Sequence, residues 1–290
     1  MHPTEWGHKT HHGESAPKSG LRAQLARGAH LTWTSLRVLA TDPRLMILPF
    51  FALVFTGFVW LIVVLSLLAM GAPPASPASG FLYQEMFLAY LVTYFLSVYF
   101  MAAIIGAAHV RLEGARPSIM VGIYAANASF FQILIWSFLA ATVGVLLRIT
   151  SIRSDAGGRF VSKLLGSGWP IATLFVLPTM VVEGVGPMRA FRRSRALLKE
   201  RWGAHQKGVL GTGVVFLLLF SFGLGPFVWG ILGEPGNLAW VVAAVVYWLI
   251  LSALWSVVHG ILVVTLYHYA EESEAAFGFS WQALNHPWIR

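Results

Sequence analysis

Six apolar stretches constrain the fold of this chain more than any other feature. They occupy residues 45–70, 81–110, 128–147, 164–182, 208–232 and 238–269. A helix needs about 20 mostly apolar residues to cross the hydrocarbon core of a bilayer, and each stretch approaches or exceeds that length. The apolar runs are continuous rather than alternating, so only helices can satisfy the backbone in lipid. The sequence therefore predicts an all-α, polytopic membrane helix bundle with about six transmembrane helices.

Composition agrees with a lipid-facing surface. Of the 290 residues, 57% are hydrophobic and only 11% are charged, whereas a soluble domain carries about 25% charged residues. The chain has no cysteine, which excludes disulfides, thiolate metal sites and cysteine nucleophiles. Residues 1–20 are polar and contain no apolar signal-peptide region. We expect a disordered polar tail over 1–20, a membrane domain over 21–270 and a cytoplasmic C-terminal tail over 271–290.

The basic residues are distributed unequally between the two sides of this topology. All but four of the 20 lysines and arginines fall in the N-terminal segment, the second and fourth connections, and the C-terminus. The positive-inside rule places these segments, and both termini, in the cytoplasm of a bacterial-type plasma membrane. The connection from Arg148 to Lys163 holds the other four and is predicted outside, so an error in the third or fourth span would show there first. With a net charge of +8, the expected partners are anionic lipids on the cytoplasmic side, and not nucleic acid.

A helix-like surface segment precedes each odd-numbered span. These segments cover residues 21–40, 117–127 and 187–202, so the unit of an interfacial helix followed by a two-span hairpin is used three times. The alternative is that any protein with a cytoplasmic N-terminus has basic approach segments. The third segment is the most basic, and such a helix can lie in the head-group plane. Its candidate anionic-lipid contacts are Arg189, Arg192, Arg193 and Lys199, although they can also be a topology signal and nothing more. We expect Arg195 to reach back to Glu183.

Two stripes of polar side chains lie on apolar helices. Ser252, Ser256 and His259 share one face of the sixth span, and Tyr90, Tyr94 and Ser97 share one face of the second. Facing stripes of this kind line a cavity in some proteins, but more often they supply interhelical hydrogen bonds. Breaks are predicted near Pro170 and Pro178 in the fourth span and near Gly223, Gly225 and Pro226 in the fifth.

No motif supports an enzyme. Gly166-Ser167-Gly168, together with His259 or His268, is reminiscent of an intramembrane serine protease, but Leu165 replaces the first glycine of the G-x-S-G pattern. The chain has no H-E-x-x-H metal motif and no phosphate-binding loop. His8, His11 and His12 belong to the expected disordered tail. We therefore predict a protein without catalytic residues, cofactor or bound metal.

From Leu36 to Trp288 the chain resembles an uncharacterised family of bacterial and archaeal multi-span membrane proteins. The resemblance rests on residues 33–45, 169–178 and 181–203, and less specifically on 278–284. The stretch V-V-E-G-V-G-P-M-R-A-F-R-R-S-R-A-L-L-K-E-R-W-G is the most specific. It is also similar to the membrane domains attached to some glycerophosphodiester phosphodiesterases, without their catalytic domain. The resemblance implies six spans and no known reaction.

These observations leave two classes of function. The first is a non-enzymatic scaffold, accessory subunit or lipid-interacting protein, with a membrane-protein partner or a second copy of itself as further partners. The second is a permease or channel for a small or amphipathic solute. The scarcity of ionisable residues inside the spans favours the first.

Overall fold

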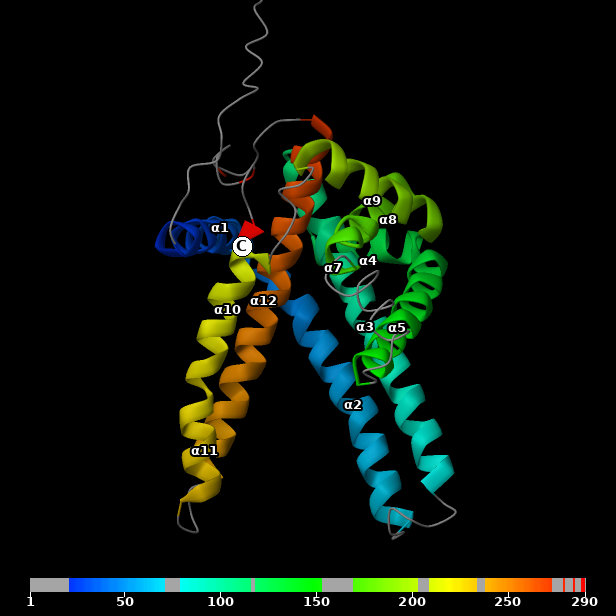
Figure 1. Ribbon diagram of the computed structural model, residues 1–290, viewed down its shortest axis with the longest axis vertical. Helices are drawn as coiled ribbons and strands as arrows, with labels where there is room; N and C mark the ends of the chain where they lie inside the picture. Colours follow the sequence, from blue (N-terminus) through cyan, green and yellow to red (C-terminus); the bar gives the residue numbers. More distant parts are fainter. Residues whose placement is uncertain are drawn as a thin grey trace, which may run out of the picture.

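A computed structural model describes residues 21–70, 79–115, 118–152, 169–202, 209–233, 238–272, 279, 284 and 288–289. In these residues the chain is almost entirely helical (Figure 1). The fold is a polytopic helix bundle, as the apolar stretches predict. The expected tail over 1–20 and most of the connection over 148–163 lie outside the described residues.

Among the described residues, four helical segments are long and apolar enough to cross a membrane. The first is α2 (Ile47–Met70), which follows the short 3-10 helix η1 (Pro43–Met46), and the second is α3 (Ser79–Leu112). The third consists of α10 (Gly211–Phe222) and α11 (Leu224–Leu232), and the fourth is α12 (Leu238–Glu272). These segments correspond to the first, second, fifth and sixth predicted spans.

The third and fourth predicted spans each meet a neighbouring surface segment at a sharp bend. Helix α4 (Ile119–Ala128) meets α5 (Phe130–Ile152) at 72°, and the segment containing α7 (Trp169–Ala172) and α8 (Val176–Glu183) meets α9 (Pro187–Trp202) at 120°. At 1.5 Å per residue, Trp169–Glu183 spans roughly 22 Å, less than a hydrocarbon core of about 30 Å. In Figure 1, α2 and α3 extend well below α5 and α7. By length and apolar composition, the described helices thus provide four candidate spans, or up to six if each bent pair counts as one.

The three expected surface segments all form helices. They are α1 (Leu21–Thr41), α4 and α9, and each comes before a pair of apolar helices. Local signals fix the start of α4 and the end of α8, the helix that precedes α9. The Ser118 hydroxyl accepts a hydrogen bond from the Met120 N–H at the start of α4 (3.3 Å), and Gly184 ends α8 in the left-handed conformation (φ 65°). Helix α1 lies nearly at right angles to α10 and α12 (Figure 1), as expected for a helix in the plane of a membrane interface.

The helices pack closely at the upper end of Figure 1. All residues from Val257 to Tyr267 of α12 are buried except His259, and all residues from Ala102 to Ala108 of α3 are buried. Small residues allow this approach. A side chain at Gly106 would strike Ala125 of α4, one at Gly122 would strike the Ala103 backbone, and one at Gly260 would strike Ile104. We call this packed region the upper core.

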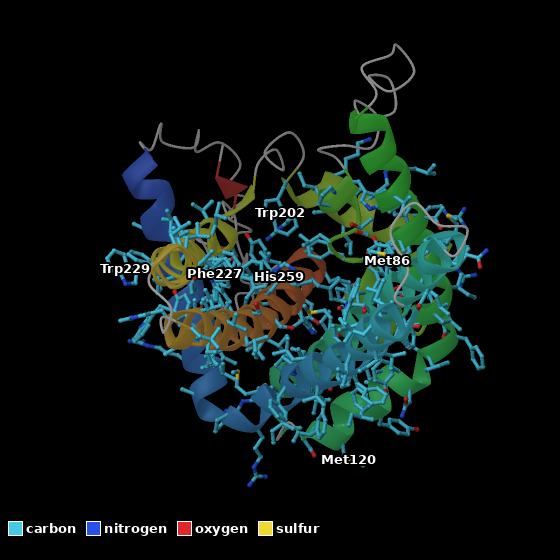
Figure 2. All side chains as sticks on the ribbon, turned by 90° about the horizontal axis from the view of Figure 1, so that it is seen from below. Met86, Met120, Trp202, Phe227, Trp229 and His259 are labelled. Carbon is cyan, nitrogen blue, oxygen red and sulfur yellow. The ribbon has the colours of Figure 1, made fainter. Side chains whose placement is uncertain are left out.

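Below the upper core the helices separate into two hairpins (Figure 1). One contains α2 and α3, and the other contains α10, α11 and α12. Within an 18-residue apolar stretch of Pro43–Ala69, only 6% of the residues are buried, and the corresponding share in Thr212–Leu232 is only 11%. Seen from below in Figure 2, Trp229 lies at the outer edge of α11, away from α12. Such exposed apolar surface is expected for helices whose solvent is lipid.

The break between α10 and α11 is capped by aromatic residues of α12. At Gly223 the helical hydrogen bonding shifts, and Pro226 lacks the N–H that would continue it. The Tyr247 hydroxyl donates to the Leu219 carbonyl (2.6 Å), and the Trp248 indole N–H donates to the Phe220 carbonyl (3.0 Å). The predicted break in the fifth span is therefore confirmed, and its carbonyl groups are satisfied by side chains.

The C-terminal residues return to the upper core. Phe279 and Leu284 are buried there, and the Trp202 indole N–H donates to the Leu284 carbonyl at 3.1 Å. Strand β1 (Val209–Leu210) pairs with strand β2 (Trp288–Ile289) in antiparallel register. At least part of the expected C-terminal tail therefore packs on the bundle.

Candidate functional site

The break in the fourth predicted span is held by a serine from α9. The N–H of Phe175, the last residue of the turn before α8, donates to the Ser194 Oγ at 3.1 Å, and that hydroxyl donates to the Ala172 carbonyl at 2.8 Å. Ser194 is fully buried. It thus satisfies one orphan donor and one orphan acceptor left by the break. This pairing fixes α9 against α7 and α8.

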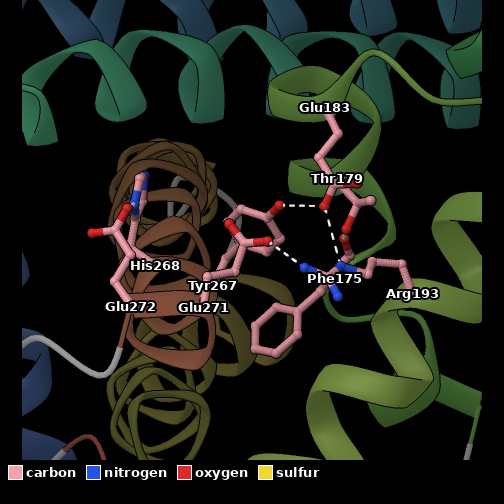
Figure 3. Close-up of polar contacts among 8 residues, drawn as sticks. All are labelled: Phe175, Thr179, Glu183, Arg193, Tyr267, His268, Glu271 and Glu272. Carbon is pink, nitrogen blue, oxygen red and sulfur yellow. Dashed lines mark hydrogen bonds and ion pairs between the residues drawn. The ribbon is translucent and has the colours of Figure 1, made fainter.

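A charged network joins the end of α8, the middle of α9 and the end of α12 (Figure 3). The Arg193 guanidinium contacts Glu183 (Nε to Oε1, 3.5 Å) and donates to Glu271 (2.9 Å). The buried Tyr267 donates its hydroxyl to the same Glu183 oxygen at 2.7 Å. The hydrogen bond to Glu271 raises the pKa of Arg193 above its ordinary value, so the arginine remains charged. With every group paired, the network is built to hold α9 in place.

A histidine pair joins α3 to α12 at the same end. His109 Nδ1 lies 2.8 Å from His268 Nε2, so one ring donates an N–H to the other. The outer nitrogen of each ring faces a carboxylate one turn further along its own helix. His109 Nε2 lies 3.4 Å from Glu113, and His268 Nδ1 lies 3.9 Å from Glu272. Three protons on the four nitrogens would satisfy every contact, whereas a fourth would set two N–H groups against each other.

The outward face of α9 is basic. Ala190, Ser194, Leu197, Leu198 and Trp202 are buried against the bundle. The opposite face is exposed and carries Arg189, Arg192, Arg195 and Lys199, together with Met188. In the described part of the chain, no ion pair to Arg189, Arg192 or Lys199 is present. We call these five residues the basic face. Arg193 belongs to the charged network instead.

The two predicted polar stripes contact different neighbours. On α3, Tyr94 packs against the cluster that contains Trp136 of α5, beside Tyr90, and Ser97 donates to the Thr93 carbonyl of its own helix. On α12, Ser252 lies in a groove beside α10 and is exposed. His259 stacks on Trp255 at 4.9 Å, and Ser256 is half-buried.

The expected contact between Arg195 and Glu183 is wrong. Arg193 makes that contact, and the Arg195 guanidinium lies over the ring of Phe191 at 5.9 Å. The reason is geometric, because α9 turns back by 120° and brings the Arg193 side of the helix toward Glu183. Sequence reasoning also missed His109, Tyr267 and Glu271. One signal was present for the histidines, since both are followed by glutamate at the fourth residue, near the ends of the two longest helices.

The fold, together with the polar contacts between its helices, defines a multi-span membrane helix bundle with surface helices at one end. Residues 80–277 match the model of a family of unknown function, DUF6159. The match covers more than half of the chain, so this protein belongs to that family. The motifs at 33–45 and 278–284 fall outside the matched range. No curated protein and no solved structure matches the chain, and the similarity to glycerophosphodiester phosphodiesterase membrane domains finds no support in these comparisons.

Proposed function

We propose that this protein is a non-enzymatic, multi-pass protein of the plasma membrane that binds anionic lipid head groups through the basic face of α9. The proposal rests on a difference between basic residues of one helix: one of them forms ion pairs within the described part of the protein, and three others do not. Arg193 is held by Glu183 and Glu271, whereas Arg189, Arg192 and Lys199 are exposed and have no acidic partner among the described residues.

The position of α9 supports this proposal. Its buried face is fixed by Ser194 and by the charged network, so the basic face is preorganised. Exposed Met188 next to cations is typical of helices at the head-group boundary. Each lysine or arginine near an anionic surface contributes about 1 kcal/mol. The proposal places this end of the bundle, and both termini, on the cytoplasmic side.

A permease or channel has less support. That reading requires the stripes of α3 and α12 to line a common cavity, and in the structure they contact α5 and α10 respectively. A role as scaffold or accessory subunit, with another membrane protein or a second copy as partner, remains compatible with lipid binding at α9.

Native mass spectrometry of the full chain tests the proposal. The protein would be released from nanodiscs of phosphatidylglycerol and phosphatidylcholine, and retained lipids counted. We expect the wild type to retain phosphatidylglycerol preferentially and the triple variant Arg189→Gln, Arg192→Gln, Lys199→Gln to lose that preference. The matched control keeps the three charges, as Arg189→Lys, Arg192→Lys and Lys199→Arg, and should leave the preference intact. Equal retention by the triple variant and the wild type would contradict the proposal.

Sidedness is tested separately by labelling. Because the sequence has no native cysteine, single cysteines introduced at Arg192 and at Gly57 of α2 can each be tested for reaction with a membrane-impermeant maleimide. We expect position 192 to react only in inside-out vesicles and position 57 to react in neither orientation. Labelling of position 192 in intact cells would contradict the cytoplasmic placement.

A further inference from the structure

An apolar groove of about 380 Å³ lies between α10 and α12. Its walls include Phe216, Leu217 and Phe220 of α10 and Leu251, Ser252 and Trp255 of α12. Leu217 and Phe220 are exposed on the outer surface of the bundle, so the groove opens toward lipid. Its volume falls in the range of small-molecule sites, about 300–1,000 Å³. Only Ser252 among these six residues is polar, which suits a hydrocarbon chain.

The groove has a defined upper end, at the level of α1. Leu36 of α1 packs against the cluster formed by Phe216, Leu251 and Val258. Leu31 of α1 packs with Leu262 and neighbouring residues of the upper core. If α1 marks the plane of the interface, the groove begins just below that plane and descends into the hydrocarbon region.

Two buried polar atoms without partners lie just beyond the lining of the groove, on the side of α1. His259 lies one turn above Trp255 and stacks on it, and its Nδ1 atom is buried with no hydrogen bond to the described residues. Thr212 lies one turn before Phe216, and its fully buried hydroxyl likewise has no partner among them. Helices α10 and α12 are antiparallel, so the start of α10, which holds Thr212, and the second half of α12, which holds His259, both lie toward α1 (Figure 1). A buried polar group left unsatisfied costs about 1–3 kcal/mol.

We propose that this groove binds the chain of a single-chain amphiphile of the fatty-acid type, with its polar end hydrogen-bonded to His259 and Thr212. A carboxylic acid both donates and accepts hydrogen bonds, which matches an imidazole nitrogen and a hydroxyl. Among the described residues that line the groove there is no lysine or arginine, so a phosphate head group would lack a cation from them. This site is separate from the basic face of α9 and does not depend on the function proposed for it.

Photocrosslinking of the full chain in detergent provides the test. The probe is a palmitic acid that carries a diazirine near the end of its chain, and peptide mass spectrometry locates the adducts. We expect adducts on residues 213–220 and 251–255. Unlabelled palmitic acid should remove them, whereas hexadecane, which has the same chain but no polar end, should compete about tenfold less well. Equal competition by the two compounds, or adducts spread evenly over α2, would overturn the proposal.

Two sets of variants test separately the groove that would hold the hydrocarbon chain and the residues that would bind its polar end. Ser252→Phe fills the groove and should reduce the adducts at least tenfold, while the matched control Ser221→Phe, on an exposed position of α10 outside the lining, should leave them unchanged. His259→Phe combined with Thr212→Val should weaken competition by palmitic acid about tenfold and leave competition by hexadecane unchanged. The α9 triple variant should label like the wild type. If Ser252→Phe has normal helicity, and is therefore folded, but labels like the wild type, the proposed site is wrong.

Discussion

The upper core and the lower hairpins are built from similarly apolar helices, yet they are stabilised differently. In the upper core, α12 and α3 are buried on almost all sides over several turns; α3 meets α4 through glycine and alanine, and α12 meets α3 at Gly260. In the lower hairpins, α2 and α11 present leucine, phenylalanine and tryptophan outward. Protein packing and interhelical hydrogen bonds hold the first region, whereas lipid solvates the second. The difference teaches that hydropathy alone does not distinguish a helix packed in protein from one immersed in lipid.

The largest expected difference between the two regions is a cavity effect. Leu262→Ala removes a fully buried side chain from the upper core and should lower the free energy of unfolding by about 2–4 kcal/mol. Leu68→Ala, at a position 73% exposed on α2, should change it by less than about 0.5 kcal/mol. Titration with sodium dodecyl sulfate in mild detergent, followed by tryptophan fluorescence, measures both. Equal losses would show that the lower hairpins are also packed against protein.

A second pair of variants adds volume rather than removing it. Gly122→Val places a side chain against the Ala103 backbone at the crossing of α3 and α4, and overpacking there should cost about 1–3 kcal/mol. Gly57→Val is the matched control, because a side chain at Gly57 meets nothing within 4 Å. The same titration applies. If Gly57→Val is the more damaging change, the outer face of α2 is not a free lipid surface.

The charged network should contribute less, since Arg193 is partly exposed. Arg193→Gln leaves Glu183 and Glu271 without their cation and should destabilise the protein by about 1 kcal/mol. Arg192→Gln changes the neighbouring residue, which makes no such contact in the structure, and should have no measurable effect on unfolding. A comparable loss in Arg192→Gln would argue against the separation of structural from outward arginines on α9.

The histidine pair is tested by a double-mutant cycle. His109→Phe and His268→Phe each remove one side of the 2.8 Å contact between α3 and α12. Their combined effect should be smaller than the sum of the single effects by about 0.5–1 kcal/mol, at the low end of the range of about 0.5–3 kcal/mol for residues in direct contact. Strict additivity in the unfolding titration would mean that the two imidazoles do not interact.

The smallest expected effect lies in the lower hairpin of α10, α11 and α12. Tyr247→Phe deletes the hydroxyl that donates to the Leu219 carbonyl at the helix break. Interhelical hydrogen bonds in membrane bundles contribute about 0.6 kcal/mol on average, so we expect a loss of that size. Tyr124→Phe, on an exposed side chain of α4, serves as the control. A loss of several kcal/mol would mean that this break governs the whole hairpin.

The sequence alone determined the helical fold, the positions of four long apolar helices and the three helical segments that precede the apolar pairs, because the length of an apolar run and the glycine and proline signals act locally. The breaks near Pro178 and Pro226 were predictable for the same reason. Only the tertiary structure decided that α5 and α7 with α8 are bent against surface helices, that Arg193 rather than Arg195 meets Glu183, and that His109 meets His268. These outcomes depend on the angles at which helices cross and turn back. Such angles are set by packing between residues far apart in the chain, and local sequence patterns do not encode them.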